Sequence, residues 1–186
     1  VFGFSAMKAV ESATSDADTL SMFLYMAFGA PIAEEILCRG LVLRPMAKYG
    51  KRFAIFMSAF FFGLLHGNIV QTPFAFVVGL VLGYVSLEYN LLWAIVLHMI
   101  NNLVLGDLIP RLTQGLGEMG SAMAVQALVW ICAAGAVAFL ITKWSRLKTY
   151  LLENPTEVGS WRGFWTSAGV IVMAILMTVN GITMLI

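Results

Sequence analysis

Charge is scarce in this chain of 186 residues: only 11% are Asp, Glu, Lys or Arg, whereas 60% are hydrophobic. Ordinary globular proteins contain roughly 45–50% apolar and about 25% charged residues. A water-soluble domain of this composition could not cover its surface with polar groups. We therefore expect one domain, 1–186, folded as a helical bundle in a lipid bilayer, rather than several soluble domains.

Cysteine is also scarce, and the two cysteines, Cys38 and Cys132, lie in different apolar segments. Neither a CxxC pair nor a Cys/His zinc spacing occurs, so we expect no disulfide framework and no thiolate zinc site. The formal net charge is +1, and no basic cluster is interleaved with aromatic residues, so we expect no nucleic-acid partner. The sequence has no legible cleavable signal peptide. Because it starts at Val1 without methionine, we expect a longer native N-terminus, with 1–18 as a flanking segment.

Six apolar stretches separated by helix-breaking residues predict six helices. A transmembrane helix needs about 20 mostly apolar residues, and several of these stretches are shorter, as in tilted or partly spanning helices. The predicted fold class is therefore all-α, a polytopic transmembrane bundle with about six spanning or partly spanning helices. The expected ranges are about 19–48 with a bend near Pro31, 52–66, 72–87, 91–108, 121–143 and 164–186.

Lys and Arg gather in two of the five connections between these segments. They are frequent in the first connection, 44–52, and in the fifth, 143–162, and nearly absent from the others. An excess of Lys and Arg marks cytoplasmic loops. We therefore expect the first and fifth connections, and by alternation the third around Glu88, to lie at one end of the bundle, facing the cytoplasm.

The two histidines of the chain, His66 and His98, and the acid pair Glu34-Glu35 lie inside apolar stretches. An ionisable side chain at membrane depth costs about 2.5–3.5 kcal/mol on insertion scales, so such residues by default mark a functional site. Taken one at a time, each has a structural explanation, such as a buried ion pair or a histidine that bonds within the core. Together they indicate a reaction centre inside the membrane.

Counting residues from the connections predicts the depth of these side chains. Glu34 and His66 each lie sixteen positions from Gly50, so in an antiparallel hairpin they end at the same level. His98 lies only eight positions after Asn90 and would be shallower by the same count. Either the turn before His98 is recessed into the bundle, or the helices are staggered.

Spacing along each helix suggests different tasks for these residues. Arg39 follows Glu35 at i+4, the favourable order for an acid–base pair on a helix, and this pair would keep Glu35 ionised. Glu34 points about 100° away around the helix and has no such partner, which makes it the candidate general base. His98 and Asn102 are spaced i, i+4, so they share one helical face and can provide two donors for an oxyanion.

Three short motifs follow one another on successive apolar segments. Glu34-Glu35-Ile36-Leu37-Cys38-Arg39 reads as EExxxR, Phe62-Gly63-Leu64-Leu65-His66 as FxxxH, and His98-Met99-Ile100-Asn101-Asn102 as HxxxN. In order and spacing they resemble the CPBP family of intramembrane proteases, which includes type II CAAX prenyl endopeptidases and bacteriocin-immunity (Abi) proteins. The resemblance covers a motif core, 30–105. The chain departs from the family at Cys38, where an aromatic residue is frequent.

The resemblance implies a role for each motif residue. In the family a glutamate and a histidine hold and deprotonate the attacking water, and a histidine and an asparagine form the oxyanion hole. The corresponding catalytic residues here would be Glu34 with His66, and His98 with Asn102. The supporting residues would be Glu35, Arg39 and Phe62.

These observations lead us to expect a CAAX-protease-like intramembrane endopeptidase that acts on a membrane-associated peptide or protein, such as a prenylated CAAX peptide or a leader peptide. The resemblance favours a glutamate-type reaction without a cofactor, although Glu34, His66 and His98 could instead be three zinc ligands with an open fourth position. The alternative function is a non-catalytic membrane scaffold or bacteriocin-immunity protein that binds a partner protein. The compact chain resembles the bacterial branch, so we expect a multi-pass protein of the bacterial cell membrane.

Overall fold

The computed structural model describes residues 20–67 and 71–183, and every regular element in these two ranges is a helix. The all-α prediction is therefore confirmed. The first helical run alternates between α-helical and wider π-helical turns. It consists of α2 (Leu20–Leu24), η2 (Tyr25–Gly29), α3 (Ala30–Glu35), η3 (Ile36–Leu43), α4 (Arg44–Met46) and the 3-10 turn η4 (Ala47–Tyr49).

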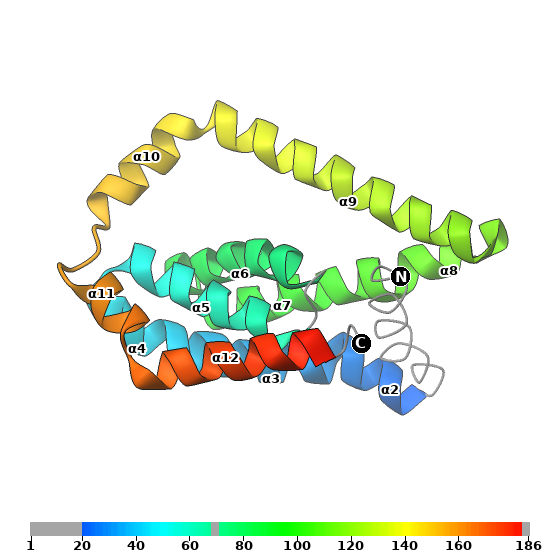
Figure 1. The fold of residues 1–186 in the computed structure, drawn as a ribbon. Coiled ribbons are helices and arrows are strands. Elements are labelled where there is room, and N and C mark those ends of the chain that lie inside the picture. The colour runs from blue at the N-terminus through cyan, green and yellow to red at the C-terminus, as the bar shows by residue number, and fades with distance from the viewer. Residues whose placement is uncertain (1–19, 68–70, 184–186) are drawn as a thin grey trace.

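The rest of the chain adds further helices around this first run (Figure 1). The central ones are α5 (Lys51–Leu65), α6 (Gln71–Glu88) and α7 (Leu91–Asn101), the last continued by η5 (Asn102–Leu108), α8 (Ile109–Thr113) and η6 (Gln114–Leu116). The C-terminal ones are α9 (Gly117–Thr142), α10 (Trp144–Glu153), α11 (Ser160–Trp165) and α12 (Ala168–Thr183).

Each described π-helical stretch ends two residues before a proline. The pairs of last residue and proline are Gly29 and Pro31, Leu43 and Pro45, and Leu108 and Pro110. Proline has no N–H to donate, and its ring presses against the carbonyl four positions earlier. A π-helical turn changes the bonding there without ending the helix, and such turns are frequent at functional sites. Two of them, η3 and η5, begin directly after the EE pair and within the HxxxN motif.

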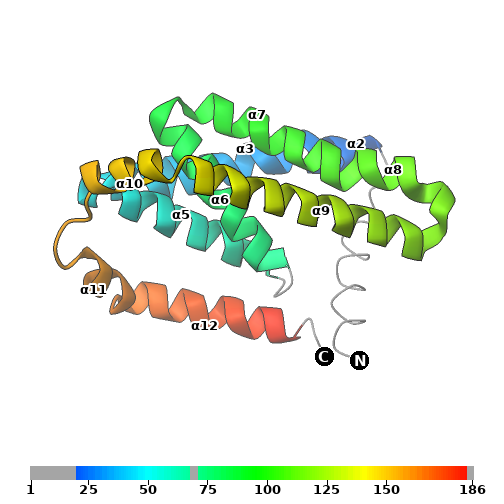
Figure 2. The same cartoon turned by 90° about the horizontal axis from the view of Figure 1, so that it is seen from above.

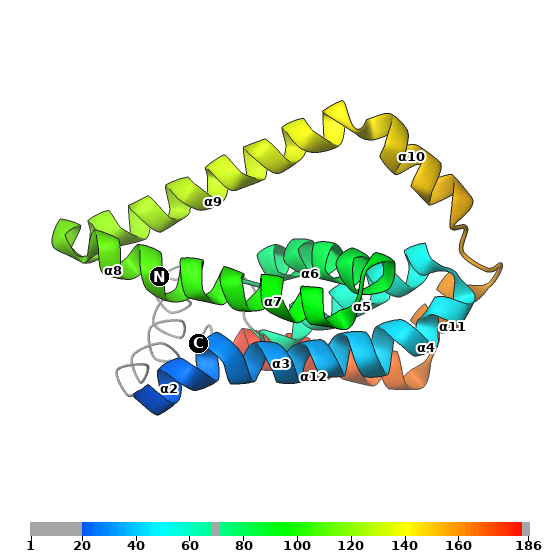
Figure 3. The same cartoon turned by 180° about the vertical axis from the view of Figure 1, so that it is seen from behind.

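The core of the bundle is the tight contact between α5 and α6, with the first run and α7 packed beside it (Figures 1 and 3). The two helices approach closely because glycines lie in their contact. A Cβ on Gly79 would lie only 3.0 Å from Cα of Ala59 and 3.1 Å from Cδ1 of Phe62. Small residues permit such close packing between membrane helices. Gly79 therefore leaves the space in which the Phe62 ring lies.

Aromatic rings attach α11 to α5. Ring centres of Phe53 and Trp161 are 5.1 Å apart, and those of Phe61 and Phe164 are 5.6 Å apart, both in edge-to-face arrangement, which is a favoured geometry for aromatic pairs. Figure 2 shows α12 on one side of the bundle and α7 on the other. Between them in the chain, α9 and α10 form an arm that leads from α8 back to α11 (Figure 1), and no described side chain of α9 is buried.

Most predicted helices agree with the observed ones to within a few residues, but the sixth was wrong at its start. The expected range 164–186 contains a break at Thr166, so Phe164 belongs to α11 and α12 begins at Ala168. The Thr166 hydroxyl donates to the carbonyl of Arg162 at 2.8 Å, and such side-chain bonds compete with helix continuation. Position 19 and positions 184–186 of the predicted helices lie outside the described residues, and α10 was not predicted.

Three helical stretches of the described chain are long and apolar enough to cross a membrane: Leu20–Tyr49, Gln71–Glu88 and Leu91–Cys132. The last of these contains a change of direction, because Gly117 adopts a φ of +73° and α9 packs back against α8. With 15 residues, α5 is shorter than a full span. The protein is thus a membrane protein by its apolar helices, while the expected number of about six spans stays a prediction.

One end of the bundle joins the first, third and fifth connections. Glu88 of the third accepts from Lys51 Nζ of the first at 2.9 Å and from the Tyr150 hydroxyl of α10 at 2.8 Å. The backbone N–H of Glu157 donates to the carbonyl of Tyr49 at 2.8 Å. Burial and the Glu88 carboxylate raise the pKa of Tyr150, so that its phenol stays a donor. The prediction that these three connections lie together is confirmed, and their cytoplasmic side stays a prediction.

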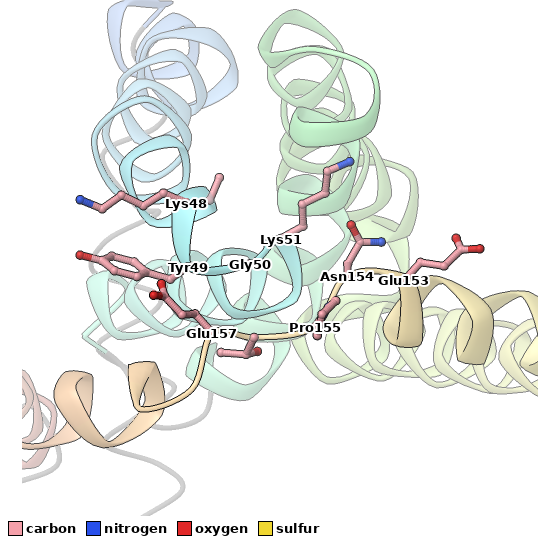
Figure 4. Close-up of a pocket in the computed structure, with 10 residues that line it drawn as sticks. Lys48, Tyr49, Gly50, Lys51, Glu153, Asn154, Pro155 and Glu157 are labelled. Atoms are coloured by element: carbon pink, nitrogen blue, oxygen red, sulfur yellow. The ribbon is translucent and has the colours of Figure 1, made fainter.

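An open surface hollow of about 390 Å³ lies at this end (Figure 4). Its walls come from two stretches, 47–51 and 153–157, and carry both lysines and glutamates. None of the predicted site residues lines it. The hollow therefore marks the junction between the first and fifth connections rather than the predicted reaction centre.

We expect Gly50→Ala to destabilise this junction. Gly50 adopts a φ of +112°, and a Cβ there would fall on the backbone of Pro155. A residue forced into such a conformation costs about 1–3 kcal/mol, which corresponds to a melting temperature lower by roughly 2–12 °C in a chain of this size. Thermal unfolding in detergent measures the change. Gly115→Ala is the matched control, because its Cβ would meet nothing within 4 Å; an equal loss in both variants would contradict the argument.

Candidate functional site

Glu35 and Arg39 form the predicted ion pair at the centre of the bundle. Both side chains are completely buried, and Arg39 Nε lies 2.9 Å from Glu35 Oε2. The N–H does not point at this oxygen, so the contact is an electrostatic one rather than a hydrogen bond. Arg39 Nη1 instead donates to the hydroxyl of Ser58 on α5 at 2.8 Å. The guanidinium thus connects the first helical run to α5.

His98 lies between the two carboxylates of the EE pair. Its Nδ1 is 3.1 Å from Glu35 Oε1, a hydrogen bond, and its Nε2 is 3.9 Å from Glu34 Oε2, which is too long for one. His98 is buried, whereas a third of the Glu34 side chain is exposed. Two ordinary hydrogen bonds of about 2.8 Å can meet at one water that contacts both Glu34 and Nε2. The pair is therefore spaced to share a water molecule.

Counting residues predicted that His98 lies shallower in the bundle than Glu34 and Glu35. In the structure His98 nevertheless contacts Glu35. In Figure 3 the turn between α6 and α7 is set back from the end of the bundle formed by the turn between α4 and α5. Because α7 starts deeper, eight residues after Asn90 suffice to bring His98 to the level of the EE pair. The recessed turn, one of the two expected explanations, accounts for the contact.

The Phe62 ring is the common neighbour of the motif residues. Its centre lies 4.9 Å from the ring of His66, 5.3 Å from the ring of His98 and 4.9 Å from the guanidinium carbon of Arg39. Phe62 is almost completely buried, and the imidazoles of His66 and His98 and the guanidinium of Arg39 all pack against its ring. Phe62 packs beside the motif residues, as the family resemblance implied.

His66 bonds within its own helix. Its Nδ1 lies 2.8 Å from the carbonyl oxygen of Phe62, and since a carbonyl only accepts, Nδ1 is the donor. The other nitrogen, Nε2, is then the acceptor in the neutral ring. No hydrogen bond or ion pair joins His66 to Glu34 among the described residues, and the shared water expected for these two residues stays a prediction.

Asn102 contacts the first helical run rather than the carboxylates. Its Nδ2 donates to the carbonyl of Met26 in η2 at 3.1 Å, and its Oδ1 accepts from Asn101 Nδ2 at 3.3 Å. An amide group has two N–H donors, so one remains available to a substrate. Sequence reasoning did not identify Met26 as a partner, since the contact spans 76 positions.

The residues named as alternative zinc ligands do not fit a metal site in this arrangement. Glu34 and His98 approach one another, but no hydrogen bond or ion pair among the described residues joins His66 to either of them. Among residues 20–67 and 71–183, no group of three His, Cys, Asp or Glu side chains is arranged to hold a metal ion.

Ser58 is a residue of this centre that the sequence interpretation missed. It is completely buried, accepts from Arg39 Nη1 at 2.8 Å and donates to the carbonyl of Cys38 at 2.9 Å. A signal was present: Ser58 is the one polar side chain between Phe53 and Leu65, and it lies four positions before Phe62 on the same helical face.

Residues 16–104 match the family model described as "Rce1-like: Type II CAAX prenyl endopeptidase Rce1-like". This range contains all seven predicted site residues and ends within η5. Comparison of the chain with curated proteins and with solved structures gave no match.

Proposed function

We propose that this chain, whose residues 16–104 match the model of the Rce1-like type II CAAX prenyl endopeptidase family, is an intramembrane endopeptidase that acts through Glu34. The family supports a CAAX-type intramembrane protease in general. The proposal adds the residues and the substrate class, a membrane-associated peptide or protein that carries either a prenylated CAAX end or a leader sequence.

The observation that carries the proposal is the placement of His98 between the carboxylates of Glu34 and Glu35. A partly exposed acid beside a buried imidazole is suited to bind water and to exchange protons with it. The buried pair of Glu35 and Arg39 orients the imidazole from the other side. Positioned acids and bases of this kind contribute typically about 10²–10⁴-fold to a rate.

In the proposed reaction, Glu34 and His66 hold a water molecule whose oxygen attacks the carbonyl carbon of the scissile peptide bond. The new C–O bond forms while the water passes one proton to Glu34, and the carbonyl oxygen becomes negative. Collapse of this intermediate breaks the C–N bond, and the leaving amine takes the proton from Glu34. The products are a new carboxyl end and a free amine.

His98 and Asn102 are the proposed donors to the negative oxygen. One preorganised donor contributes about 2.7–4 kcal/mol in a soluble protease. Asn102 retains one N–H beyond its bond to Met26. Because Nδ1 of His98 donates to Glu35 in the resting ring, Nε2 becomes a donor only while it holds the proton that Glu34 has taken from the water, and it returns this proton to Glu34 before the amine leaves.

The test is a cleavage assay in liposomes with a panel of tagged peptides. The panel contains a prenylated CAAX peptide, the same peptide without the prenyl group, and a leader peptide, and mass spectrometry identifies the bond that is cut. We expect cleavage of at least one peptide by wild type in the presence of a metal chelator, and none by His66→Gln. No cleavage of any peptide, equal cleavage by His66→Gln, or a complete loss with chelator would contradict the proposal.

A further inference from the structure

We propose that Ser58 is a positioning residue that, through Arg39 and Glu35, fixes the proton of His98 on Nδ1 and so leaves Glu34 free for water. The inference rests on the proposed function because it takes Glu34 to bind the attacking water. The chain of contacts runs from α5 through the first helical run to α7 and lies entirely in the interior.

The first step concerns what holds Arg39. A guanidinium has five N–H donors, yet Nε and Nη2 of Arg39 have no hydrogen-bond acceptor among the described residues. The bond from Nη1 to Ser58 is therefore the one directional contact of Arg39 in this part of the chain. The remaining contacts, the charge of Glu35 and the face of Phe62, fix no orientation of the guanidinium plane.

The second step concerns what holds Ser58 in turn. Its hydroxyl donates to the carbonyl of Cys38, which lies in the π-helical turn η3, at 2.9 Å. The hydroxyl proton is thus used, and the oxygen faces Arg39 as an acceptor. A serine at this position can take part in both bonds, whereas an alanine can take part in neither.

The third step concerns the proton of His98. The imidazole lies between two competing acceptors, Glu35 on its Nδ1 side at 3.1 Å and Glu34 on its Nε2 side at 3.9 Å. While Arg39 keeps Glu35 in place, the shorter contact receives the N–H. If Glu35 withdraws, Glu34 becomes the better acceptor, and it is then bonded to His98 instead of to water.

Histidine labelling tests the inference directly, because the chain has only two histidines. With ¹⁵N-labelled histidine, the imidazole nitrogen signals report which nitrogen carries the proton, and His66→Gln identifies the signals of His98. We expect wild type to show His98 protonated on Nδ1. We expect Ser58→Ala to show a second population protonated on Nε2 alone. A wild-type ring without a proton on Nδ1, or a Ser58→Ala spectrum equal to wild type, would overturn the proposal.

Two variants separate positioning from loss of packing. Ser86→Ala on α6 removes another buried hydroxyl, one that has no hydrogen-bond partner among the described residues, so it should leave the His98 signals unchanged. Ser58→Thr keeps the hydroxyl and should retain the Nδ1 proton. If Ser86→Ala changes the spectrum as much as Ser58→Ala does, the effect belongs to packing and the proposal is wrong.

The same variants give a kinetic result once a cleaved peptide is in hand. Misplacing a reacting group by about 1 Å can cost up to about 10²-fold in rate, so Ser58→Ala should lower kcat by up to that factor with KM near the wild-type value. An unchanged kcat overturns the proposal. The spectrum is recorded without substrate, so a protein that cleaves no peptide but shows the expected His98 signals overturns the proposed function and supports the positioning role.

Discussion

Glu34→Gln is expected to lower peptide cleavage by about 10²–10⁴-fold, the range typical of a positioned acid or base. The amide has nearly the shape of the carboxyl group but cannot take a proton from water. Because a third of the side chain is exposed and no hydrogen bond of it occurs among the described residues, the melting temperature should stay close to wild type. The measurement is the initial rate with the best peptide of the panel, alongside thermal unfolding in detergent.

Glu118→Gln is the matched control for this variant. Glu118 is an exposed glutamate at the start of α9, outside the motif core, and its amide variant should cleave at the wild-type rate. If Glu34→Gln cleaves as fast as wild type and Glu118→Gln, the carboxylate of Glu34 takes no part in the reaction. If neither wild type nor either variant cleaves any peptide, the non-catalytic scaffold becomes the better explanation of the motifs.

The sequence was sufficient to predict contacts between residues of the same helix. The pair of Glu35 and Arg39 follows from i, i+4 spacing alone, and the structure contains it at 2.9 Å. The turns at Gly50 and Asn90 were also readable, because glycine and asparagine interrupt apolar runs there. Such features need only local geometry, which residue types determine directly.

Contacts between helices could not be derived in the same way. That Glu35 bonds to His98 depends on how deeply the turn before α7 is recessed, and counting residues placed His98 too shallow. The bond between Asn102 and Met26 depends on the tilt of α7 against the first run. Both quantities result from side-chain packing over whole helix faces, and no short motif encodes them.

Ser58, which accepts a hydrogen bond from the buried Arg39, is another contact between helices that the sequence did not predict. A serine in an apolar helix has many structural explanations, so Ser58 did not stand out until its hydroxyl was found between Arg39 and the carbonyl of Cys38. Likewise, the π-helical turns that precede the prolines changed the twist of the motif helices in a way that ideal 3.6-residue geometry does not predict.

Arg39→Leu is expected to cause the largest loss of stability of any single substitution at this site. It leaves the completely buried Glu35 carboxylate without its counter-ion, and breaking a buried pair by removing one partner costs about 3–5 kcal/mol. At about 2–4 °C per kcal/mol for a chain of this size, the melting temperature in detergent should fall by roughly 10 °C. The double variant Glu35→Leu/Arg39→Leu should recover much of this loss, since replacing both charges by apolar side chains is often nearly neutral.

A second acid–base pair in the same chain provides the control. Asp107 and Arg111 have the same i, i+4 spacing and contact one another, but about two thirds of the Arg111 side chain is exposed. Exposed pairs on a helix are worth only about 0.3–0.5 kcal/mol, so Arg111→Leu should lower the melting temperature by no more than about 2 °C. Equal losses for Arg39→Leu and Arg111→Leu would mean that burial does not strengthen the inner pair. If the double variant is stable yet no longer holds His98 protonated on Nδ1, the pair is retained for orienting the imidazole and not for stability.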